Sequence, residues 1–82
     1  MGKRIERIFQ NEILLKKEYL TNNSATIILK NGSGYKGKII NFGVMADQEI
    51  KSCVTLKLKA NVRLQIEIDQ IQEIQIDAIT NW

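Results

Sequence analysis

The chain has 82 residues, 44% of them hydrophobic and 26% charged, and its 12 Lys and Arg outnumber nine Asp and Glu to give a net charge of +3. This mixture is typical of a globular protein and excludes a disordered polyelectrolyte. With one Cys and no His, the sequence also excludes an internal disulfide, a His-based catalytic triad and an imidazole metal site.

The length predicts a single domain over residues 1–82 that buries only about 60% of the surface of its unfolded chain, so we expect a thin core and a homo-oligomer. No apolar run reaches the roughly 18 to 20 residues of a membrane span, and no signal-peptide core follows Lys3 and Arg4. Cys53 opens a predicted strand, where a buried structural thiol is the simpler interpretation. We therefore expect a cytoplasmic protein with no membrane partner.

Residues 3–20 carry the helical pattern of the chain. Ile5, Ile8 and Phe9 recur at i, i+3 and i+4, and charged side chains fall between them. This spacing predicts an amphipathic helix that breaks or turns near Asn11. The polar residues 21–24 end the segment.

The remainder of the chain has the alternation of β-strands. Asn31-Gly32 between β-branched runs is the strongest short signal for a β-hairpin, and Gly37 inside the next strand indicates a bend or a close backbone approach. We expect a loop at 43–52 and a loose tail at 77–82. The five predicted strands are residues 25–30, 35–42, 53–59, 62–69 and 73–76.

One helix followed by five short antiparallel strands, the second strongly bent, is the order of an SH3-like barrel. Leu29-Lys30-Asn31-Gly32 together with Gly37-Lys38-Ile39-Ile40-Asn41-Phe42 resembles the first signature of Sm-like proteins, the family that includes bacterial Hfq. The resemblance implies a mainly β protein with one N-terminal helix and a five-stranded, strongly bent antiparallel Sm-like barrel over residues 25–76. It also implies rings joined through strand edges, and single-stranded RNA as a partner.

The chain departs from that family at three positions. Gly43 stands where an acidic residue is expected, and Ile68 and Asp69 stand where Hfq has Lys and His. No aromatic side chain between Phe42 and Trp82 is available to stack a base. Because the carboxylate of Asp69 repels phosphate, the sequence does not predict the uridine site of Hfq.

Basic side chains on the predicted strands are the candidates for a nucleic-acid-binding surface. If neighbouring strands bring them together, they form a stripe that displaces counterions from a phosphate backbone. The candidates, with one aromatic that can stack a base, are Lys36, Lys38, Lys57, Lys59, Arg63 and Tyr35. The alternative is that the lysines keep strand edges soluble and that the tyrosine packs at the rim of the core.

A second candidate is a lateral patch of Arg4, Arg7 and Gln10 on the predicted helix. Its alternative is the ordinary solvent face of an amphipathic helix. Charge is also uneven along the chain, since residues 1–63 hold all 12 basic side chains and five acids, while residues 64–82 hold four acids and no base. This split suits either a polyanion site or head-to-tail attraction between subunits.

Two functions follow from these features. The first is a non-enzymatic Sm-like RNA-binding or RNA-regulatory protein that holds nucleic acid electrostatically on a basic face. The second is a small protein-interaction or regulatory barrel, resembling YolD-like or phage-encoded proteins, whose strand edges and acidic tail bind a protein partner. Both expect no catalytic residue, no metal and no cofactor, because no triad, phosphate-binding loop or cluster of metal ligands stands in the sequence.

Overall fold

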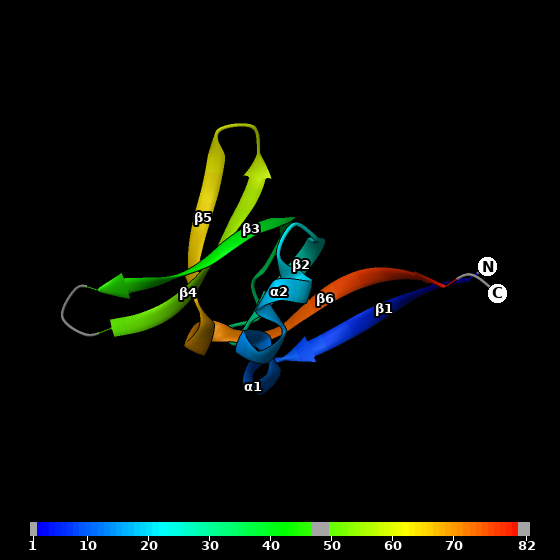
Figure 1. Cartoon of the computed structure of the whole chain (residues 1–82), viewed down its shortest axis with the longest axis horizontal. Helices are drawn as coiled ribbons and strands as arrows, with labels where there is room; N and C mark the ends of the chain where they lie inside the picture. Colours follow the sequence, from blue (N-terminus) through cyan, green and yellow to red (C-terminus); the bar gives the residue numbers. More distant parts are fainter. Residues whose placement is uncertain (1, 47–49, 81–82) are drawn as a thin grey trace.

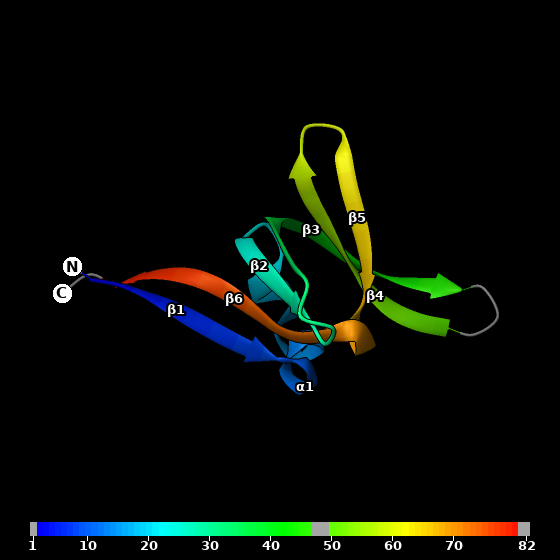
Figure 2. The same cartoon turned by 180° about the vertical axis from the view of Figure 1, so that it is seen from behind.

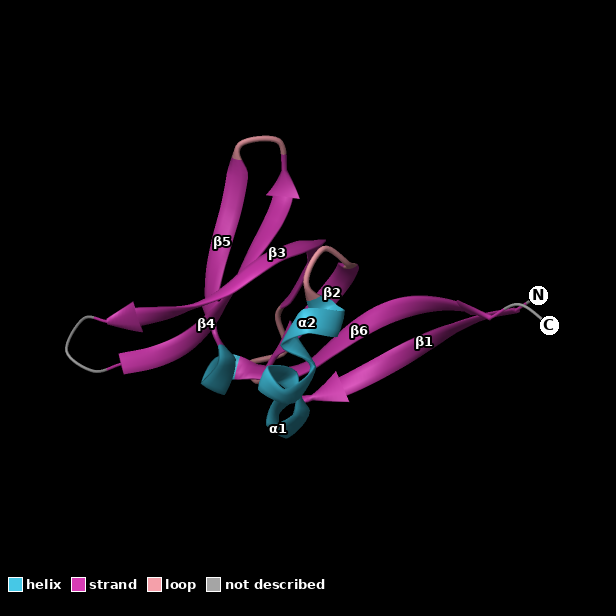
Figure 3. Cartoon of the chain, in the orientation of Figure 1, coloured by secondary structure: helices cyan, strands magenta, loops and turns pink. Residues whose placement is uncertain are grey.

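The computed structural model describes residues 2–46 and 50–80 (Figure 1). Six strands form one antiparallel sheet in the order β1-β6-β2-β3-β4-β5. β1 and β5 are its two edges, so the sheet is open, and helical structure is confined to short turns (Figure 3). In chain order the elements are β1 (Gly2–Phe9), α1 (Gln10–Ile13), the 3-10 helix η1 (Leu14–Lys16), α2 (Lys17–Leu20), β2 (Ser24–Leu29), β3 (Gly34–Ala46), β4 (Ile50–Lys59), β5 (Val62–Glu67), the 3-10 helix η2 (Ile68–Gln70) and β6 (Ile71–Thr80).

The predicted helix over 3–20 is wrong for its first part, because residues 2–9 form the strand β1. This strand pairs with β6 in continuous register from Gly2 opposite Thr80 to Phe9 opposite Glu73. Ile8 is fully buried, whereas Ile5 is 58% exposed. A helix would have put both on one face, but in a strand residues three apart point to opposite sides. The added strand raises the number in the sheet to six, where the sequence predicted five.

The helical structure that remains covers residues 10–20 and packs on the sheet through Ile13 and Leu20, both fully buried. The connector behind it is fixed to β3. The N–H of Asn22 donates to the carbonyl of Ile39 at 2.6 Å, and the N–H of Ile39 donates to the carbonyl of Asn23 at 3.0 Å. These two hydrogen bonds tie the helical segment to the middle of the sheet.

The hairpin predicted at Asn31-Gly32 is confirmed. Gly32 has a φ of +93°, and the N–H of Ser33 donates to the side-chain oxygen of Asn31 at 2.8 Å, which closes the turn between β2 and β3. Gly37 is a point of close backbone approach, since a Cβ there would collide with the carbonyl of Lys57 on β4. The turn predicted at 60–61 is also present, with Asn61 at a φ of +67°.

Two predicted irregular segments are largely strand. β3 continues to Ala46 and β4 begins at Ile50, so the predicted loop 43–52 is mostly a second part of the β3–β4 hairpin, and its residues 47–49 lie outside the described residues. The predicted tail 77–82 is strand as far as Thr80, because β1 supplies backbone partners, and residues 81–82 lie outside the described part. The predicted strand 62–69 ends at Glu67, where η2 begins.

The core lies on the inner face of the curved sheet and is closed by the helical segment (Figure 1). Phe42 is partly buried and packs against this core. The largest fully buried side chains are aliphatic: Ile8, Ile13, Leu20, Ile27, Ile39, Leu56, Ile71 and Ile74. Seen from behind in Figure 2, the free ends of β1 and β6 project from this core as a ribbon. Within residues 2–46 and 50–80, no helix is long and apolar enough to cross a membrane.

Candidate nucleic-acid interface

Three of the predicted basic side chains meet in one row across the sheet. Lys38 on β3 lies directly opposite Lys57 on β4, and Lys57 lies directly opposite Arg63 on β5. Directly opposed residues of antiparallel strands share a face of the sheet, with Cβ atoms about 5 Å apart. We call Lys38, Lys57 and Arg63 the basic row; all three side chains are exposed.

Among the described residues, no member of the basic row forms an ion pair. The ion pairs of that part of the chain join other cations, namely Arg7, Lys16 and Lys51, to their acids. Like charges placed directly opposite each other destabilise a sheet. The row therefore concentrates positive potential at one place, and a bound anion would relieve the repulsion.

A β-bulge determines what lies beside the basic row. The register of β3 and β4 shifts between Ile39 and Asn41, so Ile40 is the extra residue of the bulge. Without the bulge, strict alternation would turn Asn41 toward the core. With it, Asn41 returns to the face of Lys38, while Ile39 stays fully buried.

The bulge produces a second row parallel to the first. Asn41 lies opposite Thr55 on β4, and Thr55 lies opposite Gln65 on β5. We call Asn41, Thr55 and Gln65 the polar row. Sequence reasoning missed these three residues, because their only signal was the pair Ile39-Ile40 interrupting the alternation, which does not by itself reveal a bulge.

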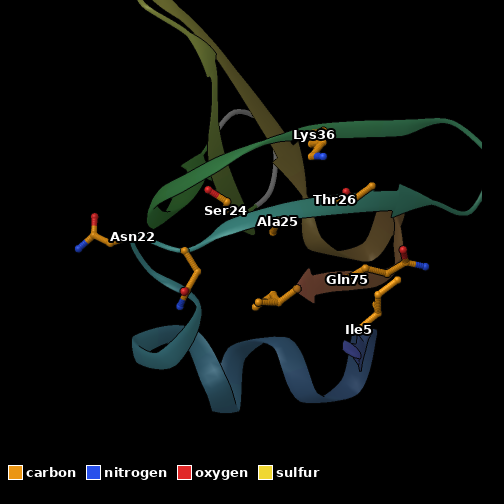
Figure 4. A pocket seen from close by; sticks show the side chains of 9 residues that line it. Ile5, Asn22, Ser24, Ala25, Thr26, Lys36 and Gln75 are labelled. Atoms are coloured by element: carbon orange, nitrogen blue, oxygen red, sulfur yellow. The ribbon is translucent and has the colours of Figure 1, made fainter. Parts of the chain in front are cut away.

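Lys36 lies on the same face as Lys38, two residues earlier on β3, and borders a separate pocket of about 400 Å³ (Figure 4). It stands opposite Thr26 on β2, which stands opposite Gln75 on β6. Ile5 on β1 completes that side of the pocket. Lys36 thus extends the positive face of the basic row toward β2 and β6.

Two predicted binding residues do not join the basic row. The register of β4 and β5 shifts after Lys57, so Lys59 lies opposite Val62 rather than a cation. Tyr35 lies opposite Ile27, which is fully buried, and therefore on the other face of the sheet from Lys36. Tyr35 instead lines an apolar hollow together with Leu29 and Leu64. This position agrees with the alternative interpretation, in which the tyrosine packs at the rim of the core.

Two side chains of the predicted lateral patch, those of Arg7 and Gln10, are described, and both form hydrogen bonds within the chain. Arg7 is on β1 rather than on a helix, and its Nε and Nη2 donate to the two carboxylate oxygens of Glu73 at 2.7 and 2.8 Å. The amide of Gln10 donates to the carbonyl of Ile68 at 3.0 Å. Arg4 is on β1, and its side chain lies outside the described part of the structure.

The Arg7–Glu73 pair is structural in character. The Glu73 side chain is only 4% exposed, and the hydrogen bonds from Arg7 and then from Gln75 lower the pKa of its carboxyl to about 2. The same pair raises the pKa of Arg7. The guanidinium also lies over the ring of Phe9, with 5.3 Å between Cζ and the ring centroid.

Within the described ranges 2–46 and 50–80, no group of three or more Cys, Asp or Glu side chains is placed to hold a metal ion. Comparisons of the chain with protein-family models, with curated proteins and with solved structures found no match in any of the three. These comparisons neither support nor contradict the resemblance to Sm-like proteins.

Proposed function

We propose that this chain is a non-enzymatic nucleic-acid-binding protein of Sm-like kinship that holds single-stranded RNA electrostatically over the basic row. The observation that carries the proposal is the register that sets Lys38, Lys57 and Arg63 side by side without acidic partners among the described residues. Cations in this arrangement neutralise consecutive phosphates and release their counterions. Lys36, on the same face, extends the track.

The strand order supports the Sm-like part of the proposal. The five strands β2 to β6 follow the predicted sequence of elements, and the last of them returns to pair with the first. Within these five strands β5 and β6 stand at opposite ends of the order but are joined only by η2, which requires the sheet to curve. β1 is an addition outside the predicted barrel, and it covers the edge of β6 that a ring of subunits would otherwise use.

A salt series tests the proposal. Fluorescence anisotropy measures the affinity of labelled 10-nucleotide RNA at 50 and 200 mM salt. Three neutralised phosphates on a single strand predict a slope of about −2 in log affinity against log salt, which is about a 20-fold loss over this range. Absence of binding at 50 mM would overturn the proposal.

A matched pair of triple variants tests whether the row is the binding surface. Lys38→Gln/Lys57→Gln/Arg63→Gln and Lys16→Gln/Lys17→Gln/Lys30→Gln remove the same charge from different places on the surface. We expect the first variant to lose at least tenfold in affinity and most of its salt dependence, and the second to lose less than threefold. Equal losses in both would contradict the basic row and leave only a net-charge effect.

The second candidate is a protein-interaction module. It is favoured by exposed apolar side chains on β1 and the helical segment, in particular Phe9, Leu14, Leu15 and Tyr19. It predicts no RNA binding at low salt and no effect of the triple variant of the basic row. The buried free Cys53 fits a reducing, cytoplasmic setting for either candidate.

A further inference from the structure

We infer that the polar row is a nucleobase subsite, in which Asn41, Thr55 and Gln65 contact the base of a nucleotide whose phosphate lies on the basic row. This inference rests on the proposed function. It adds that the chain discriminates between bases and assigns the discrimination to side chains distinct from those that provide affinity.

The two rows have the spacing of one nucleotide. Along β4, Thr55 and Lys57 are two residues apart on one face, and along β5 so are Gln65 and Arg63. Two residues of a strand span about 6.5 Å, which is comparable to the separation of the phosphate and the base within a nucleotide. A strand of RNA with its phosphate over Lys57 can therefore direct its base toward Thr55.

The three residues of the polar row line a pocket. This pocket of about 600 Å³ is lined also by Arg63, which belongs to the basic row. Its side at Gly43 is open, because a Cβ there would have no atom within 4 Å. The guanidinium of Arg63 is planar and can stack on a base, and Phe42 also lines the pocket.

The hydrogen-bonding groups of the row are available to a ligand. Among the described residues, neither the amide of Asn41 nor that of Gln65 has a side-chain hydrogen bond, and both side chains are exposed. Each amide offers two hydrogen-bond donors and one acceptor oxygen, and such groups recognise a base through hydrogen bonds to its edge. Thr55 is buried between them and adds a hydroxyl at the floor of the row.

The bulge at Ile40 points to the same conclusion. A bulge interrupts the ladder of hydrogen bonds and is common next to binding sites, where it re-aims a side chain. Here it turns a polar side chain, Asn41, out of the core and into line with Thr55.

The test compares base preference with affinity. Affinities for labelled oligo(A), oligo(U) and oligo(C) of equal length are measured at 50 and 200 mM salt for the unaltered chain, for Asn41→Ala/Gln65→Ala and for a control, Gln70→Ala/Gln72→Ala. The control removes two exposed amides outside the polar row. Thermal unfolding of each variant establishes that it is folded.

We expect the unaltered chain and the control to bind the three homopolymers with affinities that differ by about fivefold or more, as amide contacts to base edges provide. In Asn41→Ala/Gln65→Ala the difference should fall below twofold while the salt slope is unchanged. A preference that survives in this variant, or equal binding by the unaltered chain, overturns the subsite alone. Absence of binding to every homopolymer overturns the subsite together with the proposed function.

Discussion

At the residue scale, the Arg7–Glu73 pair shows how a carboxylate can stay charged inside the sheet. Glu73 stands on β6 between β1 and β2, opposite Phe9 on one side and Ile28 on the other. Burial alone would raise its pKa, but the two hydrogen bonds from the guanidinium and a third from Gln75 outweigh burial. The pair therefore connects β1 to the sheet by a charge interaction as well as by backbone pairing.

This pair makes stability dependent on pH. The pKa of Glu73 is lowered from 4.5 to about 2 in the folded chain, so the folded state binds this proton more weakly than the unfolded state. Its contribution is complete above about pH 4.5 and is lost as the pH falls toward 2. Urea unfolding at pH 6, 4.5, 3 and 2 should show a decline in free energy over this window that is smaller in Glu73→Gln. Identical pH profiles in both chains would show that the pair is not formed in solution.

Gly37 is a residue-scale constraint on the contact between β3 and β4. A Cβ at this position would overlap the carbonyl of Lys57 and approach Leu56 Cγ to 3.2 Å, so backbone must move. We expect Gly37→Ala to reduce the free energy of unfolding by about 1 to 3 kcal/mol, as overpacking does. Gly43→Ala on the same strand is the control, because nothing lies within 4 Å of its added methyl group. Chemical denaturation measures both, and equal effects would contradict the close approach.

At the element scale, β1 is where a strand replaces the expected helix. A short pattern at i, i+3 and i+4 has too few apolar positions to distinguish one helical turn from a strand with one buried residue. Backbone pairing with β6 and burial of Ile8 favour the strand. Neither is visible in the local sequence, because both depend on residues about 70 positions away.

Two substitutions distinguish the strand from the helix in solution. Ile8→Ala should cost about 2 to 4 kcal/mol, because Ile8 is fully buried. Ile5→Ala should cost under about 1 kcal/mol, because Ile5 is mostly exposed. An amphipathic helix would bury both residues and make both changes costly. Urea unfolding at one low protein concentration measures the difference.

The difference between local signals and long-range pairing explains which features the sequence could predict. The turns at Asn31-Gly32 and 60–61, and the alternating strands around them, follow from local chemistry and are confirmed. Of the predicted binding residues, Lys38 and Lys57 are aligned by the strand register, and alternation alone does not distinguish registers that differ by two residues. The bulge at Ile40 and the loss of alignment at Lys59 are backbone irregularities without a local signature.

At the scale of the whole molecule, the chain is more extended than its length requires. Its radius of gyration is 13.0 Å, against about 12 Å for a compact chain of this size, and its longest dimension is 49 Å. The ribbon of β1 and β6 accounts for this in Figures 1 and 2. β6 is paired with β2 only as far as Gln75, but its pairing with β1 continues to Thr80. In the outer half of the ribbon, the outer edge of each strand is therefore free.

A two-stranded ribbon without a covering layer is marginally stable in water. A second copy that pairs with one of its edges would cover it, and we therefore expect the chain to self-associate through the ribbon. Ile5 is an exposed apolar side chain in the outer half of this ribbon, whereas Leu15, 85% exposed, lies on η1 away from it. Ile5→Lys should weaken association at least tenfold, and Leu15→Lys should leave it unchanged.

Light scattering over a protein concentration range from 1 to 500 μM measures this association. Pairing through the ribbon predicts a mass that rises with concentration for the unaltered chain and for Leu15→Lys, and that stays near the 9.4 kDa of one chain for Ile5→Lys. A shift confined to Leu15→Lys would place the contact on the helical segment instead. A single-chain mass at every concentration would mean that the ribbon is stable without a partner, through its backbone pairing and the Arg7–Glu73 contact at its base.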